Sequence, residues 1–307
     1  MRDEQQEAFR GEFQRLALAR GIDDPNYYDA ILAIVQMVSA KRGESGTSPV
    51  TVGIAGAQGS GKSTLAGLLR IVLENVPGLS ATVLSLDDFY KTRGEREEMA
   101  RSVHPLFAVR GVPGSHDMAL LNRVVERLKS GLAVESPVFN KAQDDRSQQS
   151  RTIEAVDVIV LEGWCWGAIP QSEISLEKPV NELEKRRDSD GFWRRRVNDE
   201  LASTHYQHAF DNDLTIFLAV PDMDSVYRWR LQQEHDLVNG LVDDLDDDLD
   251  DGLADGSRVM DEAEIREFIM YYERITLAML TTMPDKADLT LTLDESHRID
   301  HWSLLSR

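Results

Sequence analysis

Short apolar runs, separated by longer stretches of helical pattern, repeat along most of the chain. Apolar runs of this length, rich in β-branched residues, predict strands that are buried on both faces of a sheet. They occur at Pro49–Ala55, Ala81–Leu86, Val156–Leu161 and Leu214–Val220, and more weakly at Leu289–Leu293. Strands that alternate with helices are joined by right-handed crossovers into a parallel sheet. The pattern predicts an α/β fold, a three-layer α/β/α sandwich around a mostly parallel sheet.

The beginning of the chain has a helical pattern without strands. Apolar residues recur at near-helical spacing over roughly Glu4–Arg20 and Pro25–Lys41. The whole chain has 307 residues, a length that fits one α/β domain with added helices. We therefore expect an N-terminal helical extension, residues 1–45, packed on a single domain formed by residues 46–307.

The composition of the chain restricts the binding partners and the cellular compartment that we expect. Hydrophobic residues make up 41% and charged residues 29% of the chain, as in a globular protein with a full core. The sequence shows no apolar run long enough for a membrane helix and no pattern of a secretory signal, so we expect a cytoplasmic protein without membrane contact. The net charge of -20 argues against nucleic acid as a partner. The single cysteine, Cys165, excludes an internal disulfide and favours a small buried residue over a reactive thiol.

Much of the negative charge lies in one acidic segment, residues 243–256. Its sequence, DDLDDDLDDGLADG, is typical of a solvated loop. A calcium loop is the alternative, because Asp246, Asp248 and Asp250 alternate as oxygen ligands do. Such a loop needs a glycine at the next position, where this chain has Asp251. We therefore favour the solvated loop.

The clearest chemical signal is a glycine-rich segment between a predicted strand and a predicted helix. Residues 56–63 read GAQGSGKS and match G-x-x-x-x-G-K-[ST], the phosphate-binding P-loop. Glycines let the backbone approach the phosphates, and the amides at the helix start face the anion. Lys62 then meets the outer phosphates, and the Ser63 hydroxyl holds magnesium. The predicted nucleotide-binding residues are Gly56, Ala57, Gln58, Gly59, Ser60, Gly61, Lys62, Ser63 and Thr64.

Acidic residues at two other strand ends complete the predicted site of this P-loop NTPase sandwich. In open parallel sheets, ligands sit beyond the carboxyl ends of the strands. Glu162 follows one apolar strand, where it supplies a carboxylate to the metal site or is a strand-end residue without a role. Asp87 and Asp88 follow another strand, and we expect Asp87 to be the base for an attacking hydroxyl. In the alternative interpretation, Asp88 caps a helix and Asp87 is a solvated neighbour.

The P-loop alone does not distinguish a GTPase from a kinase. A Ras-like GTPase would carry an Asn-Lys-x-Asp segment late in the chain. Residues 140–143 read NKAQ, with Gln143 in place of the aspartate, and they precede Glu162. We interpret this segment as a chance match, and the acid at Asp87 favours a kinase.

Taken together, these residues resemble the uridine kinase and phosphoribulokinase group of P-loop kinases, and within it the D-glycerate 3-kinase-like members. The resemblance covers about Pro49 to Leu293. Beyond the P-loop, it is carried by Leu84–Tyr90, Arg110–Asp117, Pro137–Lys141, Asp145–Arg146, Glu162–Trp164 and Trp229–Glu234.

The resemblance implies roles for further residues. It makes Asp87 the base and gives Glu162 to the magnesium site. Cationic groups near the acceptor favour an anion such as glycerate over uridine, because arginine grips a carboxylate through two hydrogen bonds. Asp117 alternatively caps the helix Met118–Lys129, and His116 and Lys141 alternatively lie on a surface loop. The implied substrate residues are Asp88, Tyr90, Arg110, His116, Asp117, Lys141 and Arg146.

The resemblance also implies a lid at about residues 222–240. Arg228 and Arg230 of this lid would close over the transferring phosphoryl group as catalytic residues, stabilising its charge and excluding water. The alternative is a surface helix with salt bridges from these arginines to Glu234 and Asp236.

The predicted function is ATP-dependent phosphoryl transfer to a hydroxyl of a small metabolite, with ATP and Mg²⁺ as cofactors and D-glycerate as the first candidate acceptor. One alternative is a kinase for a nucleoside or a pantothenate-like alcohol. Another is an ATP-binding regulatory switch that presents the acidic segment to a protein partner. The oligomeric state stays open, and the preference for ATP over GTP rests on the resemblance.

Overall fold

The computed structural model describes residues 3–19, 22–44, 46, 48–75, 78–238 and 260–305. The acidic segment predicted at 243–256, and with it the calcium alternative, lies outside the described residues. Within the described part of the chain, no helix combines the length and the apolar character of a membrane span.

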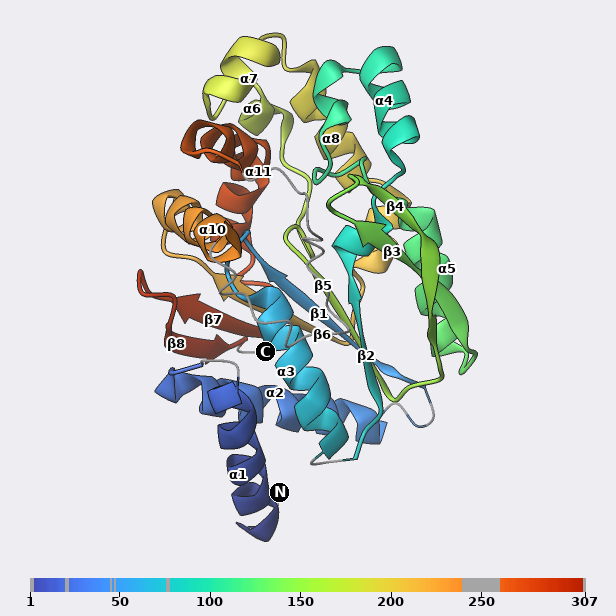
Figure 1. The fold of residues 1–307 in the computed structure, drawn as a ribbon, viewed down its shortest axis with the longest axis vertical. Coiled ribbons are helices and arrows are strands. Elements are labelled where there is room, and N and C mark those ends of the chain that lie inside the picture. Colours follow the sequence, from blue (N-terminus) through green and yellow to red (C-terminus); the bar gives the residue numbers. More distant parts are fainter. Residues whose placement is uncertain are drawn as a thin grey trace.

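A six-stranded sheet forms the centre of the molecule (Figure 1). Its strand order is β2-β5-β1-β6-β7-β8. Neighbouring strands are parallel from β2 to β7, and β8 pairs antiparallel with β7. The mostly parallel sheet is therefore confirmed. The strands are β1 (Val50–Gly56), β2 (Ala81–Ser85), β5 (Val158–Gly163), β6 (Leu214–Ala219), β7 (Leu289–Leu293) and β8 (Ile299–Leu304).

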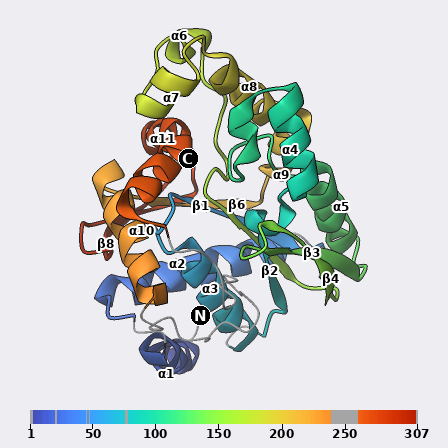
Figure 2. The same ribbon diagram turned by 45° about the horizontal axis from the view of Figure 1, so that its top comes forward.

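Helices cover both faces of this sheet, as the apolar strands require. Along β5, Val158 and Val160 pack into one apolar cluster, while Ile159 and Leu161 pack into another on the opposite face. Figure 2 shows α1 to α3 on one side of the sheet and α5 and α9 on the other, and α8 packs into the second cluster through Trp193 and Val197. The three-layer sandwich is thus confirmed. These helices are α1 (Asp3–Ala19), α2 (Pro25–Glu44), α3 (Lys62–Asn75), α5 (Met118–Lys129), α8 (Phe192–Leu201) and α9 (Thr204–Ala209).

The remaining helices lie around the carboxyl ends of the strands. The two longest, α10 and α11, pack against each other. The set is α4 (Arg93–Ser102), α6 (Glu173–Leu176), α7 (Glu182–Arg187), α10 (Met223–Val238) and α11 (Glu262–Thr282), with the 3-10 turns η1 (Leu86–Phe89) and η2 (Pro105–Ala108).

The N-terminal helices share the core of the sandwich. Phe9 of α1 and Ile31 of α2 are fully buried in the same apolar cluster as the β1 side chains. The ring centroid of Phe9 lies 5.3 Å from that of Tyr28, so aromatic contacts join the two helices. Burying a large apolar side chain contributes about 1.5–3 kcal/mol. The two helices therefore contribute to the stability of the fold.

A two-stranded hairpin of β3 (Val134–Asn140) and β4 (Asp145–Ile153) lies outside the central sheet. The guanidinium of Arg151 donates to the backbone oxygen of Val83 at 2.7 Å, which ties the hairpin to β2. Residues 141–144 form its turn, where the Gln143 amide donates to Asn140 Oδ1 at 2.9 Å. The NKAQ segment therefore spans the last residue of β3 and the first three residues of the hairpin turn.

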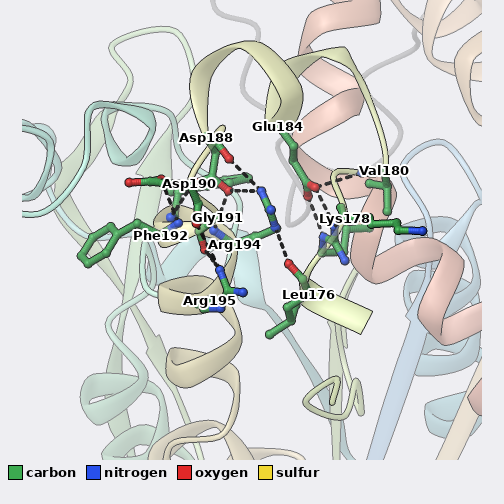
Figure 3. Close-up of polar contacts among 12 residues, drawn as sticks. Leu176, Lys178, Val180, Glu184, Asp188, Asp190, Gly191, Phe192, Arg194 and Arg195 are labelled. Carbon is green, nitrogen blue, oxygen red and sulfur yellow. Dashed lines mark hydrogen bonds and ion pairs between the residues drawn. The ribbon is translucent and has the colours of Figure 1, made fainter. Parts of the chain in front are cut away.

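The segment between β5 and α8 is anchored by buried ion pairs (Figure 3). Arg194 and Asp188, each at most 3% exposed, pair at 2.9 Å. Asp188 also accepts from the backbone amide of Trp193 at 2.7 Å and so fixes the start of α8. Removing one partner of such a pair costs about 3–5 kcal/mol, because it leaves an uncompensated buried charge. These contacts hold α8, and after it α9, in a defined position.

Candidate active site

The P-loop joins the end of β1 to the start of α3. Gly59 and Gly61 have φ angles of +72° and +86°, which L side chains rarely adopt. The Lys62 ammonium folds back and donates to the backbone oxygen of Ala57 at 3.0 Å. The Ser60 hydroxyl is buried and has no hydrogen-bond partner within the described structure. A phosphate oxygen would satisfy this hydroxyl, so the loop fits a nucleotide.

Two oxygen-bearing side chains meet beside the P-loop. The Ser63 hydroxyl lies 3.4 Å from Glu162 Oε1, and the Ser85 hydroxyl donates to the same oxygen at 2.5 Å. Burial raises the pKa of Glu162, and the charge of Asp87 adds to that effect, while Lys62 opposes it. A hydroxyl and a carboxylate are oxygen ligands of the kind Mg²⁺ prefers.

Within the described residues, no three His, Cys, Asp or Glu side chains gather into a metal site. A magnesium ion in a nucleotide site takes most of its ligands from phosphates and water. The pair of Ser63 and Glu162 therefore fits a magnesium ion that arrives with the nucleotide.

Asp87 lies just beyond β2, on the other side of β5 from the P-loop strand. The Tyr90 hydroxyl donates to Asp87 Oδ1 at 2.6 Å, and the Lys141 ammonium lies 3.8 Å from Oδ2. Partial removal from water raises the pKa of Asp87, but Lys141 and the Tyr90 hydroxyl outweigh this, and the pKa falls below its ordinary value. Asp87 is thus an ionised carboxylate at neutral pH, with 38% of its side chain exposed.

Asp88 faces the hairpin. Its Oδ1 accepts from the backbone amide of Phe139 at 3.2 Å. Burial raises its pKa to about 6, and the charge of Asp87 acts in the same direction. The cap of the turn η1 is instead Ser85, whose hydroxyl accepts from the Asp87 amide. Asp88 therefore connects the end of β2 to β3.

The cationic residues implied to bind the acceptor each contact an acid of the protein itself. Arg146 also donates to the backbone oxygen of Tyr90 at 2.9 Å, and the Arg110 guanidinium lies 5.5 Å from the centroid of the Phe139 ring. An anionic acceptor would have to compete with these acids for the cations. The ion pairs are Arg110 with Asp144, Arg146 with Asp117 at 3.5 Å, and Lys141 with Asp87 at 3.8 Å.

His116 and Asp117 follow a glycine-rich loop that runs beside Tyr90. His116 is 3% exposed, and its ring stacks on that of Tyr90 with centroids 4.9 Å apart. The surface-loop interpretation of His116 is therefore wrong. Asp117 accepts from the Leu120 amide at 3.0 Å and caps α5, as the alternative interpretation held. Its ion pair with Arg146 connects this cap to the hairpin.

The predicted lid corresponds to α10, which lies directly over the P-loop. A Cβ atom added to Gly59 would come within 3.1 Å of Trp229 Cβ. Arg228 donates to the Ser225 hydroxyl at 2.9 Å and lies 3.8 Å from Glu295, while Arg230 pairs with Glu234. The side chain of Asp236 is outside the described part of the chain. In this conformation, both arginines contact polar groups of the surrounding protein.

The structure adds site residues that the sequence analysis missed. Ser85 hydrogen-bonds Glu162, and its position at a strand end is the one signal that marks it. His297, in the turn before β8, stacks on Trp229 with ring centroids 4.4 Å apart. A Cβ atom added to Gly61 would lie 3.6 Å from His297 Nε2. No local pattern in the sequence relates this turn to the P-loop.

Comparison with known proteins agrees with this geometry. A model of the Phosphoribulokinase / Uridine kinase family matches residues 51–169. An uncharacterized kinase of Schizosaccharomyces pombe is 31% identical over 267 residues, which cover 81% of this chain and 89% of that protein. The chain belongs to the phosphoribulokinase/uridine kinase family. This member of the family is an ATP-dependent kinase of small molecules, so the predicted enzyme class is confirmed.

Two further relatives of this kinase carry a more specific name. The chloroplastic D-glycerate 3-kinase of Arabidopsis thaliana is 29% identical over 80% of this chain and 53% of that protein, so this chain spans about half of the plant enzyme. The solved structure of a D-glycerate 3-kinase from Cryptococcus neoformans matches with a TM-score of 0.73 and 25% identity, over 90% of this chain and 99% of that one. The predicted resemblance and fold are therefore confirmed.

Proposed function

We propose that this kinase transfers the γ-phosphoryl group of ATP, bound with Mg²⁺, to a hydroxyl of D-glycerate. The observation that carries the proposal is the position of Asp87. It is an ionised carboxylate held by Tyr90 and Lys141, at the end of β2, which neighbours the Glu162 strand β5 and is two strands away from the P-loop strand β1. The names of the plant and fungal relatives support glycerate as the acceptor.

On the nucleotide side, the backbone of residues 56–64 and Lys62 hold the phosphates. Ser63 and Glu162 hold the magnesium ion, and Ser85 orients Glu162 through its hydrogen bond. The ion supplies neutralisation of the charge on the phosphate oxygens. Because these groups come from one loop and two adjacent strand ends, they are arranged before the nucleotide binds.

On the acceptor side, Asp87 accepts the hydrogen of the attacking hydroxyl. The new bond joins the acceptor oxygen to the γ-phosphorus, the bond from that phosphorus to the leaving oxygen of ADP breaks, and the proton passes to the Asp87 carboxylate. A carboxylate with a low pKa orients the hydroxyl and takes its proton late, which suits the loose transition state of phosphoryl transfer.

The carboxylate of glycerate would bind among Arg110, Lys141 and Arg146. In the structure these cations already contact acids of the protein, so acceptor binding exchanges one carboxylate for another at Arg110 or Arg146. Arg228 and Arg230 of α10 would act on the transferring group after leaving their present contacts with Ser225 and Glu234.

An acceptor panel tests the proposal. Purified protein is incubated with ATP, Mg²⁺ and one acceptor at a time: D-glycerate, L-glycerate, uridine or pantothenate. We expect ADP and a phosphoglycerate to form with D-glycerate, and neither to form with the Lys62→Ala variant. Preferred turnover of uridine or pantothenate would assign the alternative acceptor class, and no acceptor-dependent ADP with any of the four would contradict the proposal.

A further inference from the structure

Tyr206 and His116 form a buried contact, and His116 stacks on Tyr90, the tyrosine that holds Asp87. The Tyr206 hydroxyl lies 2.7 Å from His116 Nδ1, and the backbone amide of Gly114 donates to the same hydroxyl at 3.0 Å. Tyr206 is 1% and His116 3% exposed. Neither the P-loop nor the metal site uses this pair, and α9, which carries Tyr206, is remote in sequence from the loop that carries His116.

The direction of these hydrogen bonds follows from what each group can donate. The Gly114 amide only donates, so the Tyr206 oxygen accepts from it. Burial lowers the pKa of His116 to about 3, against the nearby charge of Asp87, so the ring is neutral near pH 7. Among the described residues, Nδ1 is the one acceptor in hydrogen-bond contact with the Tyr206 hydroxyl, so we expect the phenol hydrogen to go to Nδ1 and the ring to carry its own hydrogen on Nε2.

This N–H group has no partner in the described structure. His116 Nε2 is buried and makes no hydrogen bond there. It lies on the side of the imidazole away from Nδ1 and therefore away from Tyr206. The ring is stacked on Tyr90, whose hydroxyl holds Asp87. A buried donor without a partner is unfavourable unless a ligand or water satisfies it, so Nε2 is free to bind a ligand, and Tyr90 connects its ring to the proposed base.

We propose that Tyr206 is a positioning residue that fixes His116 as an Nε2–H donor, and that this donor binds an oxygen of the acceptor next to the reacting hydroxyl. The inference rests on the proposed function and deepens it. A site built around a fixed donor rejects an acceptor that lacks the matching oxygen, because the N–H group would stay unpaired. The acceptor class is thus a hydroxy acid or a polyol rather than a simple alcohol.

The position of Tyr206 suits this role. It lies on α9, which follows α8, and the start of α8 is fixed by the buried contacts of Asp188 with Trp193 and Arg194 (Figure 3). A phenol on an anchored helix keeps its hydroxyl in one place. Tyr206 therefore acts on the acceptor through His116 and does not touch it.

The first measurement is the tautomer of His116 in the full-length free enzyme, by nuclear magnetic resonance of ¹⁵N-labelled histidines. We expect a neutral ring with its hydrogen on Nε2 near pH 7, and a loss of this single form in the Tyr206→Phe variant. Hydrogen on Nδ1 in the unsubstituted protein would overturn the inference. This measurement needs no acceptor, so its result does not depend on the identity of the substrate.

The second measurement is kinetic. In Tyr206→Phe, we expect the KM for D-glycerate to rise about tenfold, as for the loss of one hydrogen bond, with the KM for ATP unchanged. Tyr271→Phe, which removes another buried phenol hydroxyl, is the matched control and should leave both values unchanged. His116→Gln, with an amide near the place of Nε2, should bind D-glycerate better than His116→Asn, with its amide near Nδ1.

The two proposals fail in different ways. An unchanged KM for D-glycerate in Tyr206→Phe would overturn the inference and leave the proposed function standing. Absence of D-glycerate turnover by the unsubstituted protein would contradict the proposed function, and the tautomer of His116 would then decide the inference alone.

Discussion

The proposed nucleotide side of this site consists mainly of backbone groups, whereas the proposed acceptor side consists mainly of side chains. The proposed nucleotide side is one short stretch of chain, residues 56–64, whose glycines with positive φ let backbone amides face a phosphate. The proposed acceptor side is a network of hydrogen bonds in which side chains from the end of β2, the loop before α5 and α9 take part, together with the backbone of the β3–β4 hairpin. A backbone cradle serves any nucleoside triphosphate, whereas a side-chain network can be changed one residue at a time. Such a division would let one fold keep its nucleotide site while its acceptor site changes.

Glu162 and Asp87, the acidic residues at two strand ends, have pKa values shifted in opposite directions. Burial raises the pKa of Glu162, whereas Lys141 and Tyr90 bring the pKa of Asp87 below its ordinary value despite partial removal from water. Two carboxyl groups whose surroundings shift their pKa values in opposite directions are suited to different chemical roles. A cation beside Glu162 would offset the burial of its charge, and an ionised Asp87 suits the proposed acceptance of a hydroxyl hydrogen.

The largest effect should follow from removing the cation of the nucleotide side. Lys62→Ala deletes the ammonium that we propose meets the outer phosphates, and we expect kcat/KM for ATP to fall by about 10³-fold. The rate of ADP formation over a range of ATP concentrations measures this. A fall of less than about tenfold would show that backbone groups alone carry the phosphate charge.

The next effect concerns the metal. Glu162→Gln keeps the shape of the side chain but removes the charge, so we expect kcat to fall by about 10²-fold and the Mg²⁺ concentration for half-maximal rate to rise. Titration of the rate with Mg²⁺ measures both changes. Ser85→Ala should show the same direction with a smaller amplitude, because it only releases Glu162 from one hydrogen bond. Unchanged Mg²⁺ dependence in Glu162→Gln would remove Glu162 from the metal site.

A pH-dependent effect is expected at Asp88. Its pKa of about 6 in the fold exceeds the ordinary value of 3.8, so the protonated form stabilises the fold below about pH 4 and this contribution is lost as the pH rises through 6. Relative to the unsubstituted protein, Asp88→Asn should gain about 2 kcal/mol in unfolding free energy between pH 4 and pH 7. Urea unfolding at several pH values measures the difference. A constant difference across that range would contradict the raised pKa.

The smallest expected effect concerns the binding of the acceptor. Arg146→Ala removes the ion pair with Asp117 and the hydrogen bond to the Tyr90 oxygen, and we expect the KM for D-glycerate to rise about tenfold with the KM for ATP unchanged. Arg101→Ala, at an exposed pair with Glu98 on α4, is the matched control. A rise in the KM for ATP instead would place Arg146 on the nucleotide side.

The sequence predicted the sheet wherever strands are buried on both faces. The starts and ends of β1, β2, β5, β6 and β7 lie within two residues of their predicted positions, because continuous apolar runs mark such strands. It missed β4 because that strand is polar and only its last residue, Ile153, is buried. It missed β8 for the same reason, since only Ile299 is buried there. Exposed strands at an edge carry too little apolar pattern to be distinguished from loops.

The same difference holds for the site. The P-loop was predictable because neighbouring residues make it, and Asp87 and Glu162 because strand ends of a parallel sheet converge. The contact of Tyr206 with His116 and that of Trp229 with His297 were not predictable, because packing joins segments that are far apart in the chain. The ion pairs that occupy Arg110 and Arg146 also depend on how the hairpin folds against α5.

The most direct test of the central claim is the rate of phosphoryl transfer by Asp87→Asn, measured with its affinity for ATP. We expect kcat with D-glycerate to fall by about 10³-fold and the dissociation constant for ATP to stay the same, because the Asp87 carboxylate is proposed to act on the acceptor hydroxyl and not on the nucleotide. Asp157→Asn, which changes an acid paired with Arg42 near the start of β5, serves as the matched control with full activity. Full activity of Asp87→Asn would contradict the account.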